Sequence, residues 1–210
     1  MNKTIKAIIF DWNGVIIDDL DAVARANCDI VKALSGKTVG PSTWFQEIKQ
    51  DWHKFFFDNG VSKKDIEKVL PMMKTFYPKY ADFVKLTKNA NDVLVALSQK
   101  GIKMGILSSV DKYGINSGLN KFNLQEYFSF IISGQDVEHP KPHPEGLKKA
   151  LSFLNIEPKN IVYIDDMSTI FPVAQKLGIT TIGFKSRISN DLSSADIVID
   201  DLSQILSFIK

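Results

Sequence analysis

Five short apolar runs, rich in β-branched residues, constrain the fold of this chain more than any other feature. They end at turn-forming or charged residues and lack a clean alternation of apolar and polar positions. That pattern is typical of strands covered on both faces, as in a parallel sheet. The runs are Ile5–Phe10, Ile102–Leu107, Phe128–Ile132, Ile161–Ile164 and Ile179–Phe184, and a sixth, weaker run is Ile197–Ile199.

Helical patterns separate several of these runs. They cover Ala90–Lys100, Glu145–Leu154 and Phe171–Leu177, and each ends near a Gly or Asn, which commonly stops a helix. Strands that alternate with helices form right-handed βαβ units. The sequence therefore predicts an α/β fold, a doubly wound parallel sheet of the Rossmann-like kind.

One long segment interrupts the alternation. Between Asp19 and Lys88 we find no convincing strand, whereas apolar residues from Leu20 to Leu34 share one helical face. Further helical patterns cover about 42–59 and 62–74. We therefore expect residues 19–88 to form a small all-helical domain, and residues 1–18 and 89–210 to form the α/β core.

The helical segment is rich in aromatic residues, with ten of the chain's 22. We interpret most of them as its core, because a small body needs bulky side chains to bury enough apolar surface. The alternative is that some of them line a substrate pocket or a dimer contact.

Composition excludes several classes of protein. With 44% apolar and 24% charged residues, the chain has the composition of a soluble globular protein, and a net charge of +2 is too balanced for a dedicated nucleic-acid binder. No apolar run reaches the length of a membrane span, and the N-terminal run is too short for a signal-peptide core. Cys28 is the lone cysteine, which favours a reducing compartment. We expect a cytoplasmic protein without nucleic-acid or membrane partners.

Polar side chains follow the predicted strands, at the sheet edge where open α/β folds bind ligands. Carboxylates, hydroxyls and a lysine would converge there, and hard oxygen ligands of this kind suit Mg²⁺. Taken singly, each residue has an ordinary explanation as a turn former, a helix cap or a solvated lysine. Their order and placement agree, however, for Asp11, Asn13 and Gly14 after the first strand, Ser108 and Ser109 after the second, Lys141 after the third, and Asp165 and Asp166 after the fourth.

Two histidines flank the lysine. His139 and His143 are four residues apart, a spacing that suits a metal on a helix. Prolines at 140, 142 and 144 exclude a helix there. We therefore expect no zinc site at this pair.

Four motifs in order resemble those of the haloacid dehalogenase-like superfamily, of the phosphoglycolate phosphatase-like kind. They cover most of the predicted core, about Lys3–Ile17 and Asn89–Asp201, and the helical segment fits a type-1 cap by its position alone. The motifs are FDWNGVIIDD from Phe10, ILSS from Ile106, HPKPHPEGLKKAL from His139 and VYIDDMSTIFPVAQKLGITTIGF from Val162.

The resemblance implies a phosphatase mechanism. Asp11 would be the nucleophile and form an aspartyl-phosphate, which splits hydrolysis into two steps. Ser108, with Ser109 beside it, would bind the transferring phosphoryl group. Lys141 would offset charge on the nucleophile and the phosphate.

The resemblance also implies a magnesium site. Asp11, Asp166 and the backbone carbonyl of Asn13 would hold Mg²⁺, with Asp165 as a further ligand or as a supporting partner. The cation would neutralise phosphate charge during transfer. The expected partner is a small phosphorylated metabolite, for a protein that is a monomer or a homodimer.

The chain departs from the family pattern at three positions. The general acid of the first motif is normally Asp, and here it is Asn13, which cannot exchange the proton that leaving alcohols need. Val15 replaces the usual Thr. Ile170 stands where many members carry an acidic residue, and the Asp165–Asp166 pair would take over the role of that residue.

Asn13 leaves three hypotheses open. In the first, the protein is a slow or specialised phosphatase for substrates with good leaving groups, such as acyl phosphates or phenolic esters. In the second, it is a phosphonoacetaldehyde hydrolase-like enzyme that uses a Schiff-base lysine, for which Lys49 and Lys54 are available. In the third, it is a non-catalytic protein that binds a phosphorylated ligand. An engineered substitution would also explain Asn13. We favour the phosphatase over the binding protein, over a dehalogenase, which needs no metal, and over a receiver domain, which is shorter.

Overall fold

The computed structural model describes residues 4–48, 52–189 and 191–209, and the chain divides into two compact units. The first comprises Met1–Ile17 and Leu86–Lys210, and the second comprises Asp18–Lys85. The chain passes from one to the other at β2 (Ile17–Asp18) and β3 (Lys85–Leu86), which pair with each other. The expectation of no strand between residues 19 and 88 is therefore wrong at β3, a strand too short to produce an apolar run.

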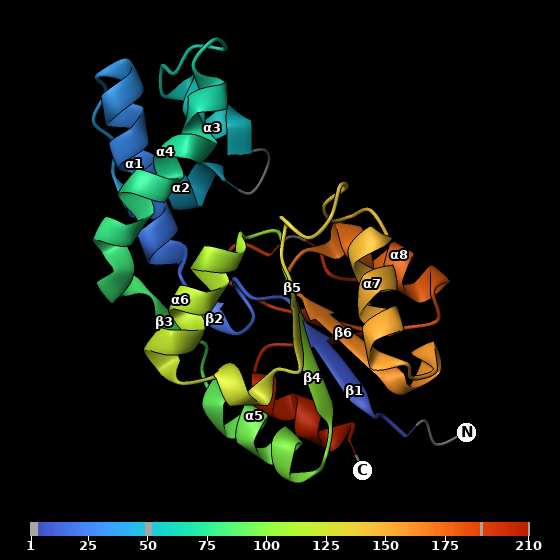
Figure 1. The fold of residues 1–210 in the computed structure, drawn as a ribbon. Coiled ribbons are helices and arrows are strands. Elements are labelled where there is room, and N and C mark those ends of the chain that lie inside the picture. The colour runs from blue at the N-terminus through green and yellow to red at the C-terminus, as the bar shows by residue number, and fades with distance from the viewer. Residues whose placement is uncertain (1–3, 49–51, 190, 210) are drawn as a thin grey trace. The chain divides into compact units, whose positions relative to one another are not determined.

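The first unit contains a six-stranded parallel sheet (Figure 1). All six predicted runs form strands, in the order β5-β4-β1-β6-β7-β8. The doubly wound α/β fold is thus confirmed. The strands are β1 (Ala7–Phe10), β4 (Lys103–Leu107), β5 (Phe130–Ile132), β6 (Ile161–Asp165), β7 (Thr180–Phe184) and β8 (Ile197–Ile199).

Strand β1 lies in the middle of the sheet, and all four of its residues are fully buried. The chain first builds outward through β4 and β5, and then returns to the other side of β1 to add β6, β7 and β8. The order therefore reverses between β1 and β6. Ligands of open α/β sheets bind outside the carboxyl ends of the strands at such a reversal.

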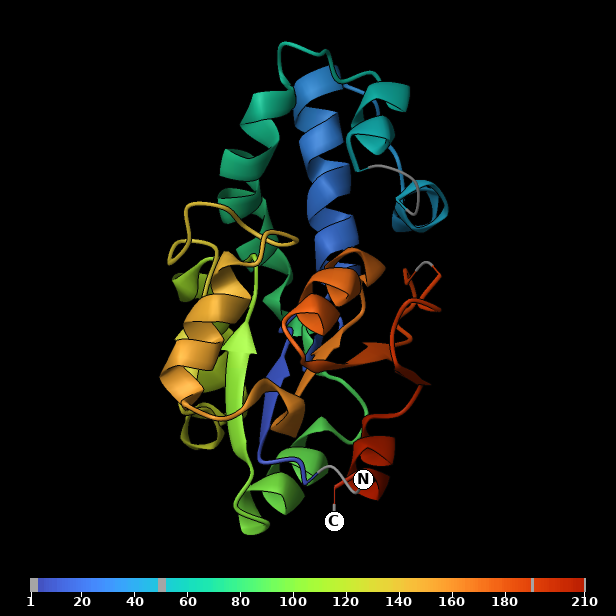
Figure 2. The same cartoon turned by 90° about the vertical axis from the view of Figure 1, so that its right-hand side faces the viewer.

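Helices cover both faces of this sheet (Figures 1 and 2). Buried side chains of α7 and α8 share one apolar cluster with Ala7, Ile9 and Tyr163 of the strands. Figure 1 shows α5 and α6 on the other side. The helices are α5 (Ala90–Gln99), α6 (Lys112–Phe122), α7 (Glu145–Leu154) and α8 (Phe171–Lys176), of which α6 lies outside the predicted patterns.

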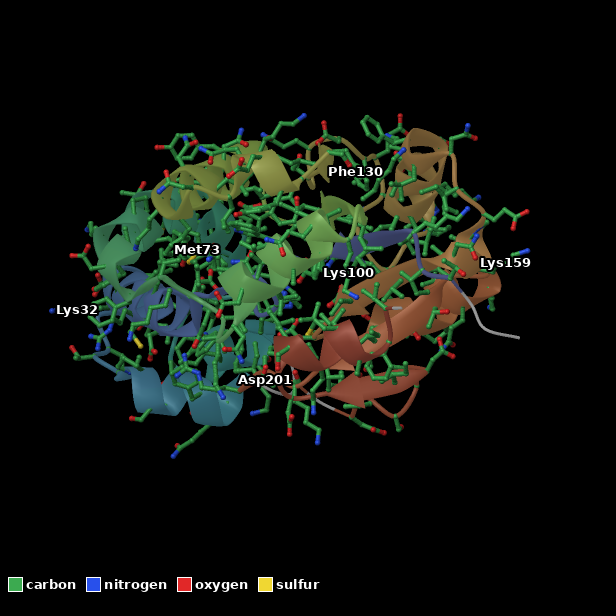
Figure 3. All side chains as sticks on the ribbon, turned by 90° about the horizontal axis from the view of Figure 1, so that it is seen from below. Lys32, Met73, Lys100, Phe130, Lys159 and Asp201 are labelled. Carbon is green, nitrogen blue, oxygen red and sulfur yellow. The ribbon has the colours of Figure 1, made fainter. Side chains whose placement is uncertain are left out.

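The C-terminal segment is fixed to the start and end of α5. Asn89 Nδ2 donates to Asp201 Oδ1 at 2.8 Å, and Lys100 Nζ donates to the Ile209 carbonyl at 3.2 Å; Lys100 and Asp201 are labelled in Figure 3. Short 3₁₀ helices complete this unit: η3 (Gln125–Tyr127), η4 (Pro158–Asn160), η5 (Ser168–Ile170) and η6 (Leu202–Ser207).

The second unit is helical apart from its two boundary strands. Helix α1 packs against α2, α4 and η2. The pattern over 42–59 corresponds to two separate helices, and residues 49–51 between them lie outside the described residues. The elements are α1 (Leu20–Ser35), α2 (Pro41–Glu47), α3 (Trp52–Asp58), η1 (Ile66–Lys68), α4 (Val69–Phe76) and η2 (Tyr77–Phe83).

Only three of the ten aromatic residues of the second unit, all of which lie within the described ranges, are buried. Those three are Trp44, Phe55 and Phe56, whereas Phe45, Phe76, Tyr77 and Tyr80 are partly buried, and Trp52, Phe57 and Phe83 are exposed. The expectation that most of these aromatics form the core is therefore wrong. Across the described ranges, none of the helices is long and apolar enough to cross a membrane.

Candidate active site

Two carboxylates meet at the carboxyl ends of the two central strands. Asp11 directly follows β1, and Asp165 is the last residue of β6. The parallel register pairs Phe10 with Ile164, and the Asp11 N–H donates to the Ile164 carbonyl at 2.8 Å. The backbone therefore places Asp11 beside Asp165, at the point where the strand order reverses.

Lys141 joins these two carboxylates. Its Nζ lies 2.8 Å from Asp11 Oδ1 and 2.8 Å from Asp165 Oδ2. All three side chains are largely buried: that of Lys141 is 16% exposed, that of Asp11 9% and that of Asp165 0%. Burial alone lowers the pKa of Lys141, but the charges of Asp11 and Asp165 outweigh it and hold that pKa well above its usual value. Lys141 is therefore charged.

Tyr163 is a member of the site that the sequence analysis missed. Its hydroxyl donates to Asp165 Oδ2, and Lys141 Nζ lies 3.3 Å from the same hydroxyl. Burial, followed by the charge of Asp165, raises the pKa of Tyr163 well above its usual value, so the phenol stays protonated. Residues two apart on a strand share a face, and this was the signal that could have found Tyr163 beside Asp165.

Asp166 lies against the turn that follows β1. Gly14 has a positive φ of 78°, and a Cβ built there would lie 2.3 Å from Asp166 Oδ2. Both the backbone conformation and the close approach require glycine. Ser186 acts to lower the pKa of Asp166 and so partly offsets the effect of burial. Asn13 lies in the same turn, where it forms a β-bridge with Ile17.

The three carboxylates form a cluster with excess negative charge. Oxygen atoms of Asp11, Asp165 and Asp166 lie within 4.8 Å of one another. Burial, only partly offset by Lys141, raises the pKa of Asp11 to about 6. Burial, with the charges of Asp11 and Asp165, raises that of Asp166 to about 7. One ammonium faces three carboxylates, so a divalent cation would balance the charge, and the all-oxygen donor set fits Mg²⁺.

The two predicted serines follow β4. Strand β4 is the neighbour of β1 on the side away from β6. Ser108 is buried, and its hydroxyl accepts a hydrogen bond from the Val110 N–H at 3.3 Å. That contact uses an acceptor lone pair of Ser108 and not its O–H. Ser109 is exposed.

Lys54, one of the two lysines considered for a Schiff base, is an exposed residue of α3. Lys54 forms an ion pair with Asp58 one turn along α3, and its side chain is 51% exposed. The hydrogen bond to Asp58 raises the pKa of Lys54, whereas a Schiff-base lysine needs a lowered pKa. Lys49 lies outside the described residues.

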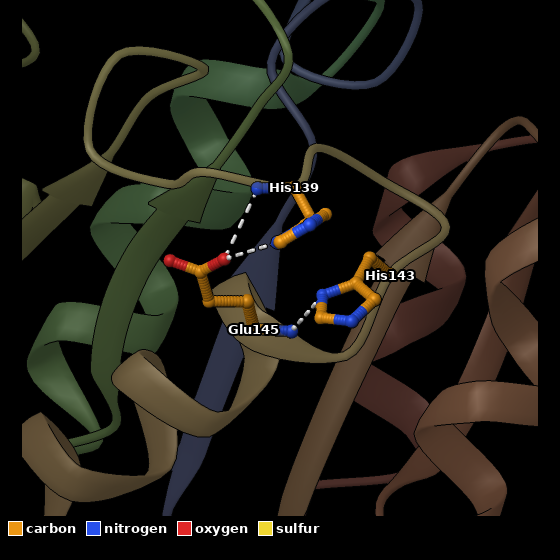
Figure 4. A group of neighbouring side chains, drawn as sticks. All are labelled: His139, His143 and Glu145. Atoms are coloured by element: carbon orange, nitrogen blue, oxygen red, sulfur yellow. Dashed lines mark hydrogen bonds and ion pairs between the residues drawn. The ribbon is translucent and has the colours of Figure 1, made fainter.

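The histidine pair differs from expectation. The chain at 139–143 is not helical, yet the rings of His139 and His143 lie side by side with centroids 4.6 Å apart (Figure 4). The prediction that the prolines exclude a helix is confirmed, but the premise that only a helix would bring the two histidines together is wrong. A turn, closed by the His143 N–H donating to the Pro140 carbonyl at 3.0 Å, brings them together without a helix.

A family model described as haloacid dehalogenase-like hydrolase matches residues 8–184, which include every candidate site residue. The chain belongs to this family. It is accordingly an enzyme, a hydrolase of the haloacid dehalogenase-like family, and the resemblance on which the expected mechanism was based is confirmed.

Relatives match the chain over nearly its whole length. Pyrophosphatase PpaX of Anoxybacillus flavithermus is 29% identical, with 98% of this chain and 97% of that protein covered. A Lactobacillus plantarum crystal structure described as a phosphoglycolate phosphatase has a TM-score of 0.82 at 18% identity and covers 98% of this chain and 100% of its own. CbbY from Rhodobacter sphaeroides, in complex with phosphate, has a TM-score of 0.77 at 17% identity, with 98% and 99% covered. The two structural likenesses support the fold.

Proposed function

We propose that the protein is a Mg²⁺-dependent phosphatase that hydrolyses a small phosphorylated compound through an aspartyl-phosphate on Asp11. The observation that carries the proposal is the buried contact between Lys141 Nζ and Asp11 Oδ1. A charged lysine holds one carboxylate oxygen of Asp11 and so orients the other. That arrangement suits a carboxylate nucleophile in phosphoryl transfer, where positioning and charge stabilisation supply most of the catalysis.

The reaction takes two steps at Asp11. A carboxylate oxygen attacks phosphorus, and the bond from phosphorus to the leaving group breaks, with the electron pair going to that group. Water then hydrolyses the acyl phosphate, which releases orthophosphate and restores the Asp11 carboxylate. Lys141 offsets negative charge in both steps. The Ser108 O–H donates to the phosphoryl oxygens, and Ser109 follows it in the chain.

Asp11, Asp166 and the backbone carbonyl of Asn13 would hold Mg²⁺, which neutralises phosphate charge when bound. Asp165 has a different role in this proposal. Its Oδ1 accepts the Met167 N–H at 2.8 Å, and its Oδ2 accepts from Tyr163 and Lys141. With both oxygens engaged, Asp165 serves to hold Lys141 in place.

Asn13 narrows the substrate class. An amide can neither give a proton to a leaving alkoxide nor take one from water, and that exchange contributes about 10²- to 10⁴-fold in rate. Substrates whose leaving group departs as a stable anion do not need the donated proton. Phosphoanhydrides and acyl phosphates meet this requirement, and several relatives of the chain are pyrophosphatases. We therefore propose phosphoanhydrides, of which pyrophosphate is the simplest, and acyl phosphates as substrates.

The test is a panel of pyrophosphate, acetyl phosphate, p-nitrophenyl phosphate and a simple alkyl phosphate, with Mg²⁺ and with a chelator. Turnover is expected for the first three, only with Mg²⁺, and should disappear in Asp11→Asn because no carboxylate remains to attack. Hydrolysis retained by Asp11→Asn would contradict the covalent mechanism. Binding of phosphate without turnover of any substrate would favour the non-catalytic alternative.

A further inference from the structure

The segment that presents Lys141 is a tight turn with a histidine on each side. The hydrogen bond from the His143 N–H to the Pro140 carbonyl reverses the chain. Lys141 lies within the turn and reaches the buried carboxylates, whereas His139 and His143 are both exposed. The two imidazoles therefore meet at the surface, outside the proposed catalytic residues.

Glu145, the first residue of α7, completes a group of three potential ligands (Figure 4). Its Oε1 accepts the Glu138 N–H at 3.1 Å and pairs with Lys149 Nζ at 2.8 Å. Its Oε2 accepts the His139 N–H at 3.1 Å and lies 3.5 Å from His139 Nδ1. These contacts fix the carboxylate with Oε2 directed at His139. The hydrogen bond from Lys149, followed by that from the His139 N–H, lowers the pKa of Glu145 to about 2, so it is ionised.

We propose that His139, His143 and Glu145 form a second metal site, for a Zn²⁺-like transition-metal cation. One ligand atom from each residue lies within 4.8 Å of the other two. Ligand bonds of about 2.0–2.2 Å in a tetrahedral site bring ligand atoms roughly 3.5 Å apart, which small rotations of two exposed imidazoles achieve. The contact from the Glu145 N–H to His143 Nδ1 is long, at 3.4 Å, so little is lost when a metal replaces it.

The donor set separates this site from the carboxylate cluster. Two imidazole nitrogens and one carboxylate suit Zn²⁺, Co²⁺, Ni²⁺ or Cu²⁺, whereas Mg²⁺ prefers oxygen ligands throughout. The position of the proposed metal site also affects the turn that carries Lys141. A cation held by His139 and His143 links both sides of the turn that carries Lys141, and so restrains the loop that delivers this lysine to Asp11. The site does not depend on the proposed phosphatase activity.

The experiment measures Zn²⁺ binding to the chelator-stripped full chain by calorimetry, in excess Mg²⁺ so that Mg²⁺ competes for the carboxylate cluster. One equivalent of Zn²⁺ is expected to bind. His139→Ala and His143→Ala should each weaken binding by roughly tenfold or more, since even supporting partners of ligands contribute that much. His53→Ala is the matched control, because the chain has three histidines and His53 lies on α3. Both substituted side chains are exposed, so the variants should keep the wild-type unfolding temperature.

Co²⁺ provides a second readout, because its visible absorption reports its ligands. The wild-type spectrum should change in His143→Ala and stay the same in His53→Ala. Three results would overturn the proposal: no Zn²⁺ binding in excess Mg²⁺, equal affinity in the wild type and His139→Ala, or binding abolished only by Asp166→Asn. The last would assign the Zn²⁺ to the carboxylate cluster.

Discussion

The hydroxyl of Tyr163 donates a hydrogen bond to the carboxylate of Asp165, two residues farther along the same strand. The same carboxylate oxygen receives Lys141 Nζ at 2.8 Å. A phenol, a carboxylate and an ammonium thus form a buried chain of contacts that ends at Asp11. Partners that orient a catalytic group in this way determine how well it is positioned.

Tyr163→Phe tests whether this chain of contacts positions Lys141. The ring remains in the core, but the hydrogen bond donated to Asp165 and the one accepted from Lys141 are lost, which should lower the free energy of unfolding by about 1–3 kcal/mol. We expect a fall in kcat with little change in KM for a given substrate, because the lysine is positioned less well while substrate contacts remain. Tyr113→Phe is the control, since Tyr113 is 80% exposed. Equal kcat in Tyr163→Phe and the wild type would contradict the positioning role.

Gly14→Ala tests the contact between the first turn and Asp166. Gly101→Ala is a matched control, because Gly101 also has a positive φ, of 71°, but a Cβ there would meet nothing within 4 Å. Both substitutions should lower stability by about 1–2 kcal/mol through backbone strain. Only Gly14→Ala should also displace Asp166 and weaken Mg²⁺ binding, as measured by calorimetry. Equal Mg²⁺ affinity in both variants would show that the contact does not shape the metal site.

Strong local patterns made most of the core predictable. Helix α7 and strand β8 begin and end at the predicted residues, because apolar periodicity and clear boundary residues agree there. Helix α6 was missed because Gly114 and Gly118 weaken its helical pattern. A Cβ at Gly118 would lie 2.6 Å from the Trp12 ring, so a packing contact far away in sequence explains this glycine.

At the candidate site, the positions of the carboxylates were predictable from the sequence, whereas the contacts of the side chains were not. Strand-end position identified Asp11, Asp165 and Asp166, because parallel strands end at one edge of the sheet. The contacts of Lys141 were harder to predict, since they depend on a turn whose geometry no periodic pattern reveals. The pairing of His139 with His143 depends on the same turn.

Removal of divalent cations should make stability fall as the pH rises. The pKa of Asp166 is raised from 3.8 to about 7 in the folded protein, and that of Asp11 to about 6. The folded state therefore binds these protons more tightly than the unfolded chain does, so this contribution is complete below pH 3.8 and is lost as the pH passes through 7. The unfolding temperature in a chelator should fall between about pH 5 and pH 8, and Mg²⁺ should restore it at pH 8. A smaller fall is expected in Asp166→Asn, and an unfolding temperature that rises over this range would contradict the prediction.

Asp166→Ala should weaken Mg²⁺ binding far more than Asp136→Ala does. Mg²⁺ uses few protein carboxylates and demands near-ideal geometry, so the loss of one ligand is costly. Asp136 accepts hydrogen bonds from Ser133 and pairs with Lys112, so its loss should affect the local turn rather than the cation. Calorimetric titration with Mg²⁺ at matched folded fractions measures the difference. Equal affinities would mean that the cation lies elsewhere.

Asn13→Asp tests the missing general acid directly. Asn and Asp have nearly the same shape, so the carboxyl can take the place of the amide with little repacking. If the site lacks only its acid, turnover of alkyl phosphates should rise by roughly tenfold or more, the low end of what a positioned general acid contributes. Pyrophosphate and p-nitrophenyl phosphate should gain less, because their leaving groups depart without a proton. The ratio of the two gains, at fixed Mg²⁺, is the readout, since a general change in folding or metal affinity would alter both classes equally. No gain for either class would mean that more than the acid is missing, and would favour the ligand-binding alternative over the phosphatase.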